Sequence, residues 1–167
     1  MRAALIPSDI RMDYAMTMES IGIAPGSGTR TCDIATVTVF IVDSSTIVRE
    51  RLSVLLAELD SVEVIGNAHS AGIAISAIRA DKPDLVIQDV HTADGSGIDL
   101  LRAIKQAACP PLVIVLTNDA YPAYRKVYLQ AGADFFLDKS SEFDQIPEVL
   151  RRLLSEQTAL GDGTKGE

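Results

Sequence analysis

Several features are missing from this sequence, and each absence excludes a class of protein. No apolar run approaches the ~20 residues that a membrane-spanning helix needs. The apolar stretch within residues 1–13 is too short for a secretory signal, and acids interrupt it. Basic residues never cluster beyond Arg151–Arg152, and the formal net charge is -8, so the charge pattern of a nucleic-acid-binding protein is absent. We therefore expect a cytoplasmic protein that binds neither nucleic acids nor membranes.

Cysteine is also scarce. Cys32 and Cys109 are far apart and match neither a metal-binding nor a redox spacing. This favours a reduced compartment. The segment "GSGT" at 26–29 is not a phosphate-binding loop, because no Lys-Ser/Thr pair follows it at the required distance.

What remains is the composition of a globular protein, with 47% apolar and 23% charged residues in a chain of 167. Residues 1–35 differ in character from the rest, and "APGSGT" breaks any helix within them. We expect an N-terminal extension over 1–35, loosely ordered or with one short helix. A single domain over 36–156 and a flexible tail over 157–167 should follow.

From Thr36 onward, strand-like and helix-like patterns alternate five times. The continuous apolar run over 37–42 predicts a strand covered on both faces, and further strands are expected over 62–66, 84–88, 112–117 and 135–138. In the first predicted helix, capped by Ser44, Ser45 or Thr46, the inward-facing residues are expected to be Ile47, Val48, Leu52, Leu55, Leu56 and Leu59. Pro122 suits the start of the fourth helix and Gly132 its end. The pattern predicts an α/β fold, a doubly wound five-stranded parallel sheet with helices on both faces.

Polar residues stand directly after four of these strands. The strands end at Asp43, Asp89, Thr117 and Lys139, whereas the second strand offers only Asn67, which we interpret as a turn residue. Each has an ordinary explanation as a cap, turn, strand or surface residue. Because parallel strands present their carboxyl ends at one edge of the sheet, we expect the four to form one polar site.

Four segments resemble the receiver domain of two-component response regulators, in the right order and spacing. They are "VFIVDSSTIVRERL", "PDLVIQDVHTADGSGIDLL", "VIVLTND" and "AGADFFLDKS". The resemblance extends from about Val37 to Ser155 and is to the chemotaxis-regulator-like, stand-alone kind. It implies a flavodoxin-like (receiver) fold with strand order 2-1-3-4-5.

The resemblance assigns a role to each polar residue. It makes Asp89 the phosphoacceptor, Thr117 the hydroxyl that moves to the phosphoryl group, and Lys139 the salt-bridge partner. Phe136 takes the place of the aromatic switch residue. A carboxylate is a competent nucleophile, and phosphoryl transfer depends mainly on neutralised charge and positioning.

The metal site implied by the resemblance is incomplete. It would hold Mg²⁺ through Asp43, Asp89 and the backbone carbonyl of His91, but Ser44 stands where the family has a second acid. A hydroxyl does not replace the attraction of a carboxylate for Mg²⁺, so Ser44 is a doubtful ligand and we expect weak metal binding.

Three readings of the function follow. In the first, the chain is a single-domain receiver that is phosphorylated on Asp89. In the second, it is a pseudo-receiver, a binding module that acts without phosphorylation because Ser44 weakens the Mg²⁺ site. In the third, the fold hosts an unrelated flavodoxin-like enzyme, although "DSSTIV" lacks the glycine of a phosphate-binding loop. We favour the first, in which the chain is no enzyme beyond self-catalysed phosphorylation and dephosphorylation.

The expected partners are proteins. The resemblance implies a histidine kinase or phosphotransfer protein as donor and a downstream protein as target. Output, and a homodimer, would use the surface of the fourth helix, the strand 135–138 and the last helix. Tyr124, Tyr128 and Phe135 either form an amphipathic patch there, or Phe135 and one of the two tyrosines are core residues. The amide of Gln88 is expected to hydrogen-bond either in the polar site or against a helix.

Overall fold

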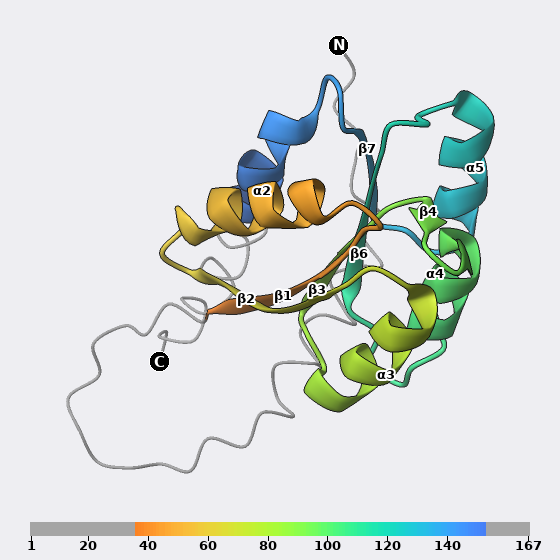
Figure 1. Cartoon of the computed structure of the whole chain (residues 1–167), viewed down its shortest axis with the longest axis horizontal. Coiled ribbons are helices and arrows are strands. Elements are labelled where there is room, and N and C mark those ends of the chain that lie inside the picture. Colours follow the sequence, from red (N-terminus) through yellow and green to blue (C-terminus); the bar gives the residue numbers. More distant parts are fainter. Residues whose placement is uncertain (1–35, 153–167) are drawn as a thin grey trace, which may run out of the picture. The chain divides into compact units, whose positions relative to one another are not determined.

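A computed structural model describes residues 36–152 and has a five-stranded sheet at its centre (Figure 1). The order is β2-β1-β3-β6-β7, which equals the predicted 2-1-3-4-5, and every neighbouring pair is parallel. The strands are β1 (Val37–Val42), β2 (Val62–Ala68), β3 (Leu85–Gln88), β6 (Leu112–Thr117) and β7 (Phe135–Asp138). The predicted doubly wound α/β fold is confirmed.

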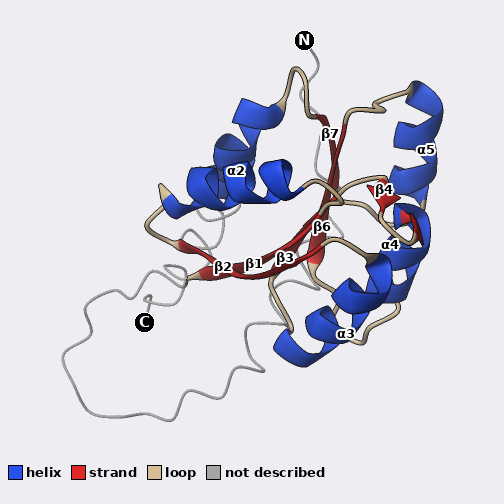
Figure 2. Ribbon diagram, in the orientation of Figure 1, coloured by secondary structure: helices blue, strands red, loops and turns tan. Residues whose placement is uncertain are grey.

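Helices cover both faces of this sheet (Figure 2). They are α2 (Thr46–Ala57), α3 (Ala71–Asp81), α4 (Gly97–Lys105), α5 (Pro122–Gln130) and a last helix that begins with the 3-10 turn η1 (Phe143–Gln145) and continues through 146–152. α2 and the last helix lie on one side of the sheet, and α3, α4 and α5 on the other. The predicted turn after β3 contains a small hairpin of β4 (His91–Thr92) and β5 (Gly95–Ser96).

Burial explains the continuous apolar runs. All four residues of β3 and all six of β6 are buried, since both strands have neighbours on each side and helices on each face. On the side of α3 and α4, the core gathers residues from all five strands of the sheet around Val86 and Val113. The sheet is therefore a rigid platform whose strand ends are fixed relative to one another.

Helix ends follow the expected chemistry. The Ser45 hydroxyl accepts a hydrogen bond from the Val48 amide at 3.4 Å and caps α2, so one of the three candidate caps is confirmed. Pro122 opens α5. After α5, Gly132 has φ +107, a conformation that favours glycine.

Two details of the sequence reading were wrong. Ile47 was expected to face inward but is 76% exposed, and Val54, seven residues later, is 67% exposed. The face of α2 that packs on the sheet is the one that carries Leu52 and Leu56. Asn67 is no turn residue: it lies inside β2, paired with Ile41, because β2 continues to Ala68.

Some expectations fall outside the described residues. These are the extension over 1–35, the tail over 157–167, and the continuation of the last helix through Leu153 and Leu154. Across 36–152, none of the helices is long and apolar enough to cross a membrane.

Candidate functional site

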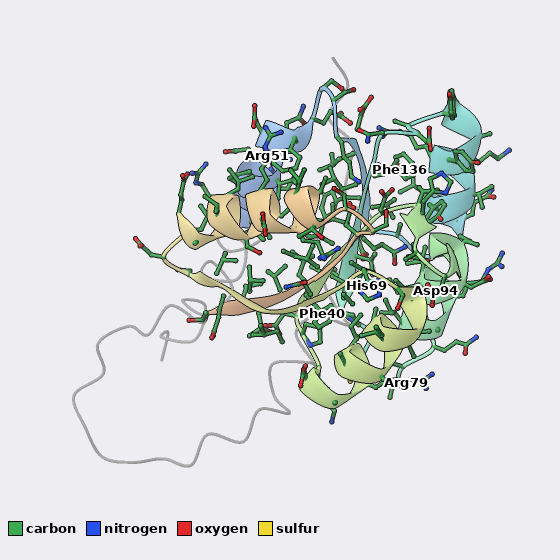
Figure 3. The ribbon with its side chains drawn as sticks, viewed as in Figure 1. Phe40, Arg51, His69, Arg79, Asp94 and Phe136 are labelled. Carbon is green, nitrogen blue, oxygen red and sulfur yellow. The ribbon has the colours of Figure 1, made fainter. Side chains whose placement is uncertain are left out.

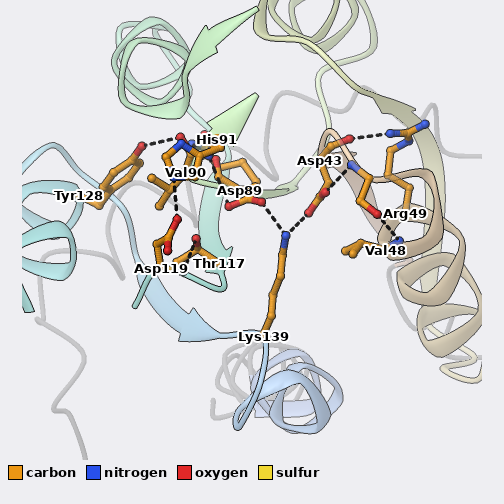
Figure 4. Close-up of polar contacts among 12 residues, drawn as sticks. Asp43, Val48, Arg49, Asp89, Val90, His91, Thr117, Asp119, Tyr128 and Lys139 are labelled. Atoms are coloured by element: carbon orange, nitrogen blue, oxygen red, sulfur yellow. Dashed lines mark hydrogen bonds and ion pairs between the residues drawn. The ribbon is translucent and has the colours of Figure 1, made fainter. Parts of the chain in front are cut away.

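Three charged side chains from three strand ends meet at the carboxyl edge of the sheet (Figure 4). The Lys139 ammonium lies 2.5 Å from Asp43 Oδ2 and 2.6 Å from Asp89 Oδ2. The side chains of Lys139, Asp43 and Asp89 are only 7%, 3% and 11% exposed. The Lys139 ammonium thus bridges two buried carboxylates from different strands.

The backbone hydrogen bonds of the sheet place these residues side by side at the carboxyl ends of their strands. Its hydrogen bonds continue one residue past each strand: the Asp43 amide donates to Ala68 O at 3.1 Å and the Asp89 amide to Val42 O at 2.9 Å. The Lys139 amide likewise donates to Thr117 O at 2.9 Å. Thr117, which ends β6, is itself 1% exposed. The four residues predicted from the strand ends therefore belong to one edge of the sheet.

Asp43 is held from a second side by α2. Its Oδ1 accepts the Ser45 amide at 2.8 Å, and its backbone oxygen accepts Arg49 Nη1 at 2.6 Å. Arg49 Nε also donates to Asn67 Oδ1 at 3.1 Å, which ties α2 to β2. Sequence reasoning missed Arg49, since nothing in the helical periodicity marks it as a contact of the strand ends.

A rim of polar contacts surrounds Asp89 and Thr117 (Figure 4). The His91 amide approaches Asp89 Oδ1 at 3.4 Å, and the Thr117 hydroxyl accepts the Asp119 amide at 3.1 Å. His91 Nε2 lies 2.8 Å from Asp119 Oδ2, with both side chains half-exposed. This contact links the loop after β3 to the loop after β6. Asp119 was not predicted, although a carboxylate two residues after Thr117 was a readable signal.

The loop after β3 is anchored at its tip by Asp94. Asp94 Oδ1 accepts the Ala71 amide at 2.7 Å and Oδ2 the Gly72 amide at 3.0 Å. These bonds, led by that from Gly72, lower the pKa of Asp94. Ser70, at the cap position of α3, makes no side-chain cap bond, so an acid from a different segment caps this helix. Figure 3 shows Asp94 at this helix start, near His69, whose backbone oxygen accepts the Ala93 amide at 3.0 Å.

The aromatic residues divide between core and surface. Phe136 is 3% exposed and packs against Tyr128, which is 2% exposed, with the ring centroids 6.0 Å apart. Tyr128 therefore belongs to the core, whereas Tyr124 is 39% exposed and Phe135 is partly buried. The Tyr128 hydroxyl donates to Val90 O at 3.2 Å, which connects α5 to the residue directly after Asp89. The expectation that one tyrosine is core is confirmed by Tyr128, but Phe135 is only partly buried.

The oxygen ligands that this site offers, the carboxylates of Asp43 and Asp89, are of the kind that Mg²⁺ prefers, but there are only two of them among the buried residues described. Two carboxylates and one ammonium leave a formal excess of one negative charge in a buried place, and Mg²⁺ in proteins uses one or two carboxylates and keeps several waters. Ser44, which follows Asp43 in the chain, is exposed. Within residues 36–152, no cluster of three or more His, Cys, Asp or Glu side chains is suited to hold a metal ion. Asp43 and Asp89 are the two buried carboxylates of this group.

Comparison with known protein families matches residues 39–151 to the response regulator receiver domain. The chain belongs to this family. Among solved structures, it is similar to the signal receiver domain of the putative response regulator NarL from Mycobacterium tuberculosis, with a TM-score of 0.67 and 26% identity over 72% of this chain and 98% of that one. The response regulator domain of Thermotoga maritima CheB gives a TM-score of 0.63 and 25% identity, over 72% and 95% of the two chains.

Curated relatives of this receiver are longer proteins. It is 36% identical to a protein-glutamate methylesterase/protein-glutamine glutaminase of Desulfotalea psychrophila, over 62% of this chain and 29% of the relative. It is 30% identical to the sensory transduction protein LytT of Enterococcus faecalis, over 71% and 48% of the two chains. The chain therefore spans less than half the length of these relatives, and the similarity covers its receiver region. As a receiver domain, it belongs to two-component signal transduction.

Proposed function

We propose that this receiver accepts a phosphoryl group on Asp89 and signals through protein–protein contact. The observation that carries the proposal is the contact of the Lys139 ammonium with Asp89 Oδ2 at 2.6 Å inside a buried charged group. A carboxylate that is fixed in direction by a lysine ammonium is equipped to attack a phosphorus atom.

In the proposed reaction, an Asp89 oxygen forms a bond to the phosphorus of the donor as the bond to the leaving group breaks. An acyl phosphate results, and the leaving group departs with the electron pair of the broken bond. Lys139 supplies a fixed positive charge beside the transferred group. Mg²⁺, when bound through Asp43 and Asp89 and the expected His91 carbonyl, would supply further neutralisation of charge.

The proposed signal leaves the site through Thr117 and Phe136. The Thr117 hydroxyl accepts a hydrogen bond from the Asp119 amide and is available as a donor to a phosphoryl oxygen. Phe136 packs on Tyr128, and the Arg125 guanidinium lies 5.3 Å from the centre of the Phe136 ring. A rearrangement of this group would change the surface of α5, which is the expected output face.

The direct test is the intact mass of the chain after incubation with acetyl phosphate and Mg²⁺. We expect one added phosphoryl group in the wild type and none in Asp89→Asn. Asp119→Asn is the matched control: it neutralises another carboxylate at the same edge and should still gain the mass. An added mass that persists in Asp89→Asn would contradict the assignment.

The second candidate is a pseudo-receiver that acts by binding alone. Ser44 favours it, because the site has one carboxylate fewer than the family pattern implies. A folded wild-type chain that gains no phosphoryl group at any Mg²⁺ concentration would select this candidate.

The identity of the partners remains part of the proposal. A histidine kinase or phosphotransfer protein is the expected donor. A downstream protein target, a homodimer through α5, β7 and the last helix, and a stand-alone arrangement of the receiver stay predictions.

A further inference from the structure

We propose that Gln88 is a positioning residue that fixes the loop carrying the phosphoacceptor. The inference rests on the function proposed for Asp89 and concerns the neighbouring residue in β3. Gln88 is 0% exposed and reaches from the sheet to the first residue of α4.

The surroundings of Gln88 make an amide unexpected. Its sheet partners are Val42 in β1 and Val115 in β6, both 0% exposed and part of the apolar core on the side of α3 and α4. Among the described residues, its Oε1 is buried and has no hydrogen-bond donor. A buried acceptor without a donor destabilises a fold, and an apolar side chain of the same length would avoid that loss. The presence of an amide at this position therefore has to be explained by the contacts of its nitrogen, Nε2.

The nitrogen of the Gln88 side chain, Nε2, joins the first and last residues of the loop 89–97. Gln88 Nε2 donates to Gly97 O at 2.8 Å and lies 3.5 Å from Asp89 O. The Gly97 amide donates to Val90 O at 2.8 Å. A Cβ at position 97 would lie 2.4 Å from Asp89 O and 3.1 Å from Gln88 Nε2, so this close approach requires glycine. Gln88 and Gly97 together form a clasp beneath the acceptor.

The clasp holds the parts of the site that the sheet alone does not fix. The sheet bonds the Asp89 amide, whereas His91 lies farther into the loop, whose tip Asp94 anchors on α3. Because Ser44 contributes no carboxylate, the position of the His91 carbonyl should weigh more in metal binding than in a site with three acids. A fixed loop would offset part of that deficit.

The test compares Gln88→Met with the wild type. Methionine keeps the unbranched shape and removes both polar atoms of the amide. Without metal, we expect the amides of residues 90–97 to exchange about tenfold faster with solvent, as follows from the loss of one hydrogen bond. Amides of β1 and β6 should be unchanged. In the acetyl phosphate assay, the Mg²⁺ concentration for half-maximal loading should rise severalfold.

Ile104→Val is the matched control, because it removes one buried methylene from α4 and leaves the clasp intact. It should alter neither the exchange of residues 90–97 nor the Mg²⁺ midpoint. The inference is overturned if Gln88→Met keeps wild-type exchange and midpoint, or if Ile104→Val produces the same losses.

A measurement on the wild type makes the test independent of how the variant folds. The side-chain amide protons of Gln88 should exchange far more slowly in NMR spectra than those of the exposed Gln106; equal rates would also overturn the clasp.

The failure of this inference and the failure of the proposed function can be told apart. A wild type that is never phosphorylated contradicts the role of Asp89, whereas fast-exchanging loop or Gln88 protons contradict the clasp.

Discussion

At the scale of single residues, the site depends on one ammonium group shared by two carboxylates. Lys139 contacts both Asp43 and Asp89, and all three side chains are nearly excluded from water. Charges in such a place need partners, because the loss of hydration otherwise outweighs any gain. Lys139 therefore has a structural role besides the chemical role that we propose for it.

Lys139→Met should lose phosphorylation and lower the free energy of unfolding by about 3–5 kcal/mol, since two buried carboxylates would face each other unpaired. Urea denaturation measures the stability, and the intact mass of the chain measures the phosphorylation. Adding Asp89→Asn to this variant should restore part of the stability by removing one of the two like charges. A double variant no more stable than Lys139→Met would contradict this explanation.

Ser44→Asp should tighten Mg²⁺ binding. Position 44 is exposed, so a carboxylate fits there, and the added charge should lower the Mg²⁺ midpoint for loading by about tenfold, or about 1.4 kcal/mol. The control is Ser45→Asp, which adds the same charge one residue away and keeps a good helix cap. An unchanged midpoint in Ser44→Asp would show that the missing acid is not what limits metal binding.

At the scale of elements, the start of α3 depends on a residue from another segment. Asp94 caps the Ala71 and Gly72 amides and thereby fastens the hairpin of β4 and β5 to this helix. The hydrogen bonds that lower the pKa of Asp94 also make this contact sensitive to pH.

Asp94→Ala should destabilise the domain at neutral pH, with a smaller effect in acid. Because the folded-state pKa lies below the unfolded one, the contribution of Asp94 is present above the unfolded pKa and disappears as the pH falls through the folded pKa. Denaturation of both proteins at about pH 7 and about pH 3 measures the difference. Asp99→Ala, which removes an exposed acid from α4, should show little effect at either pH. A difference that is the same at both pH values would refute the role of the ionised carboxylate.

At the scale of the whole molecule, occupation of the site should stabilise the entire domain. The residues of the site come from strands that span the sheet, so a ligand that bridges them binds the folded state only. Beryllofluoride, which imitates a phosphoryl group on a carboxylate, is the probe for this effect.

With Mg²⁺ present, beryllofluoride at a hundred times its Kd should stabilise the wild type by about 2.7 kcal/mol. Thermal unfolding detects this as a higher Tm. Asp89→Asn replaces the carboxylate that we propose as the acceptor, so this variant should show no rise. A rise of equal size in Asp89→Asn would place the bound anion elsewhere on the molecule.

The sequence by itself determined the sheet and the residues at its edge. Continuous apolar runs appear only where strands are buried on both faces, and parallel strands bring their carboxyl ends together. Asp43, Asp89 and Lys139 could therefore be grouped before any coordinates were known. The end of α5 could also be predicted from local sequence, because Gly132, two residues after the helix, has a positive φ, which favours glycine.

Only the tertiary structure decided what holds that edge in place. The clasp of Gln88, the cap from Asp94 and the bond from Tyr128 to Val90 join residues 9 to 38 positions apart. Such contacts leave no period in the sequence, because they depend on how loops and helices close over the sheet. The outward direction of Ile47 was decided in the same way, by the face of α2 that met the strands. The local sequence pattern therefore predicted which polar groups lie at the edge of the sheet, and long-range packing holds them in place.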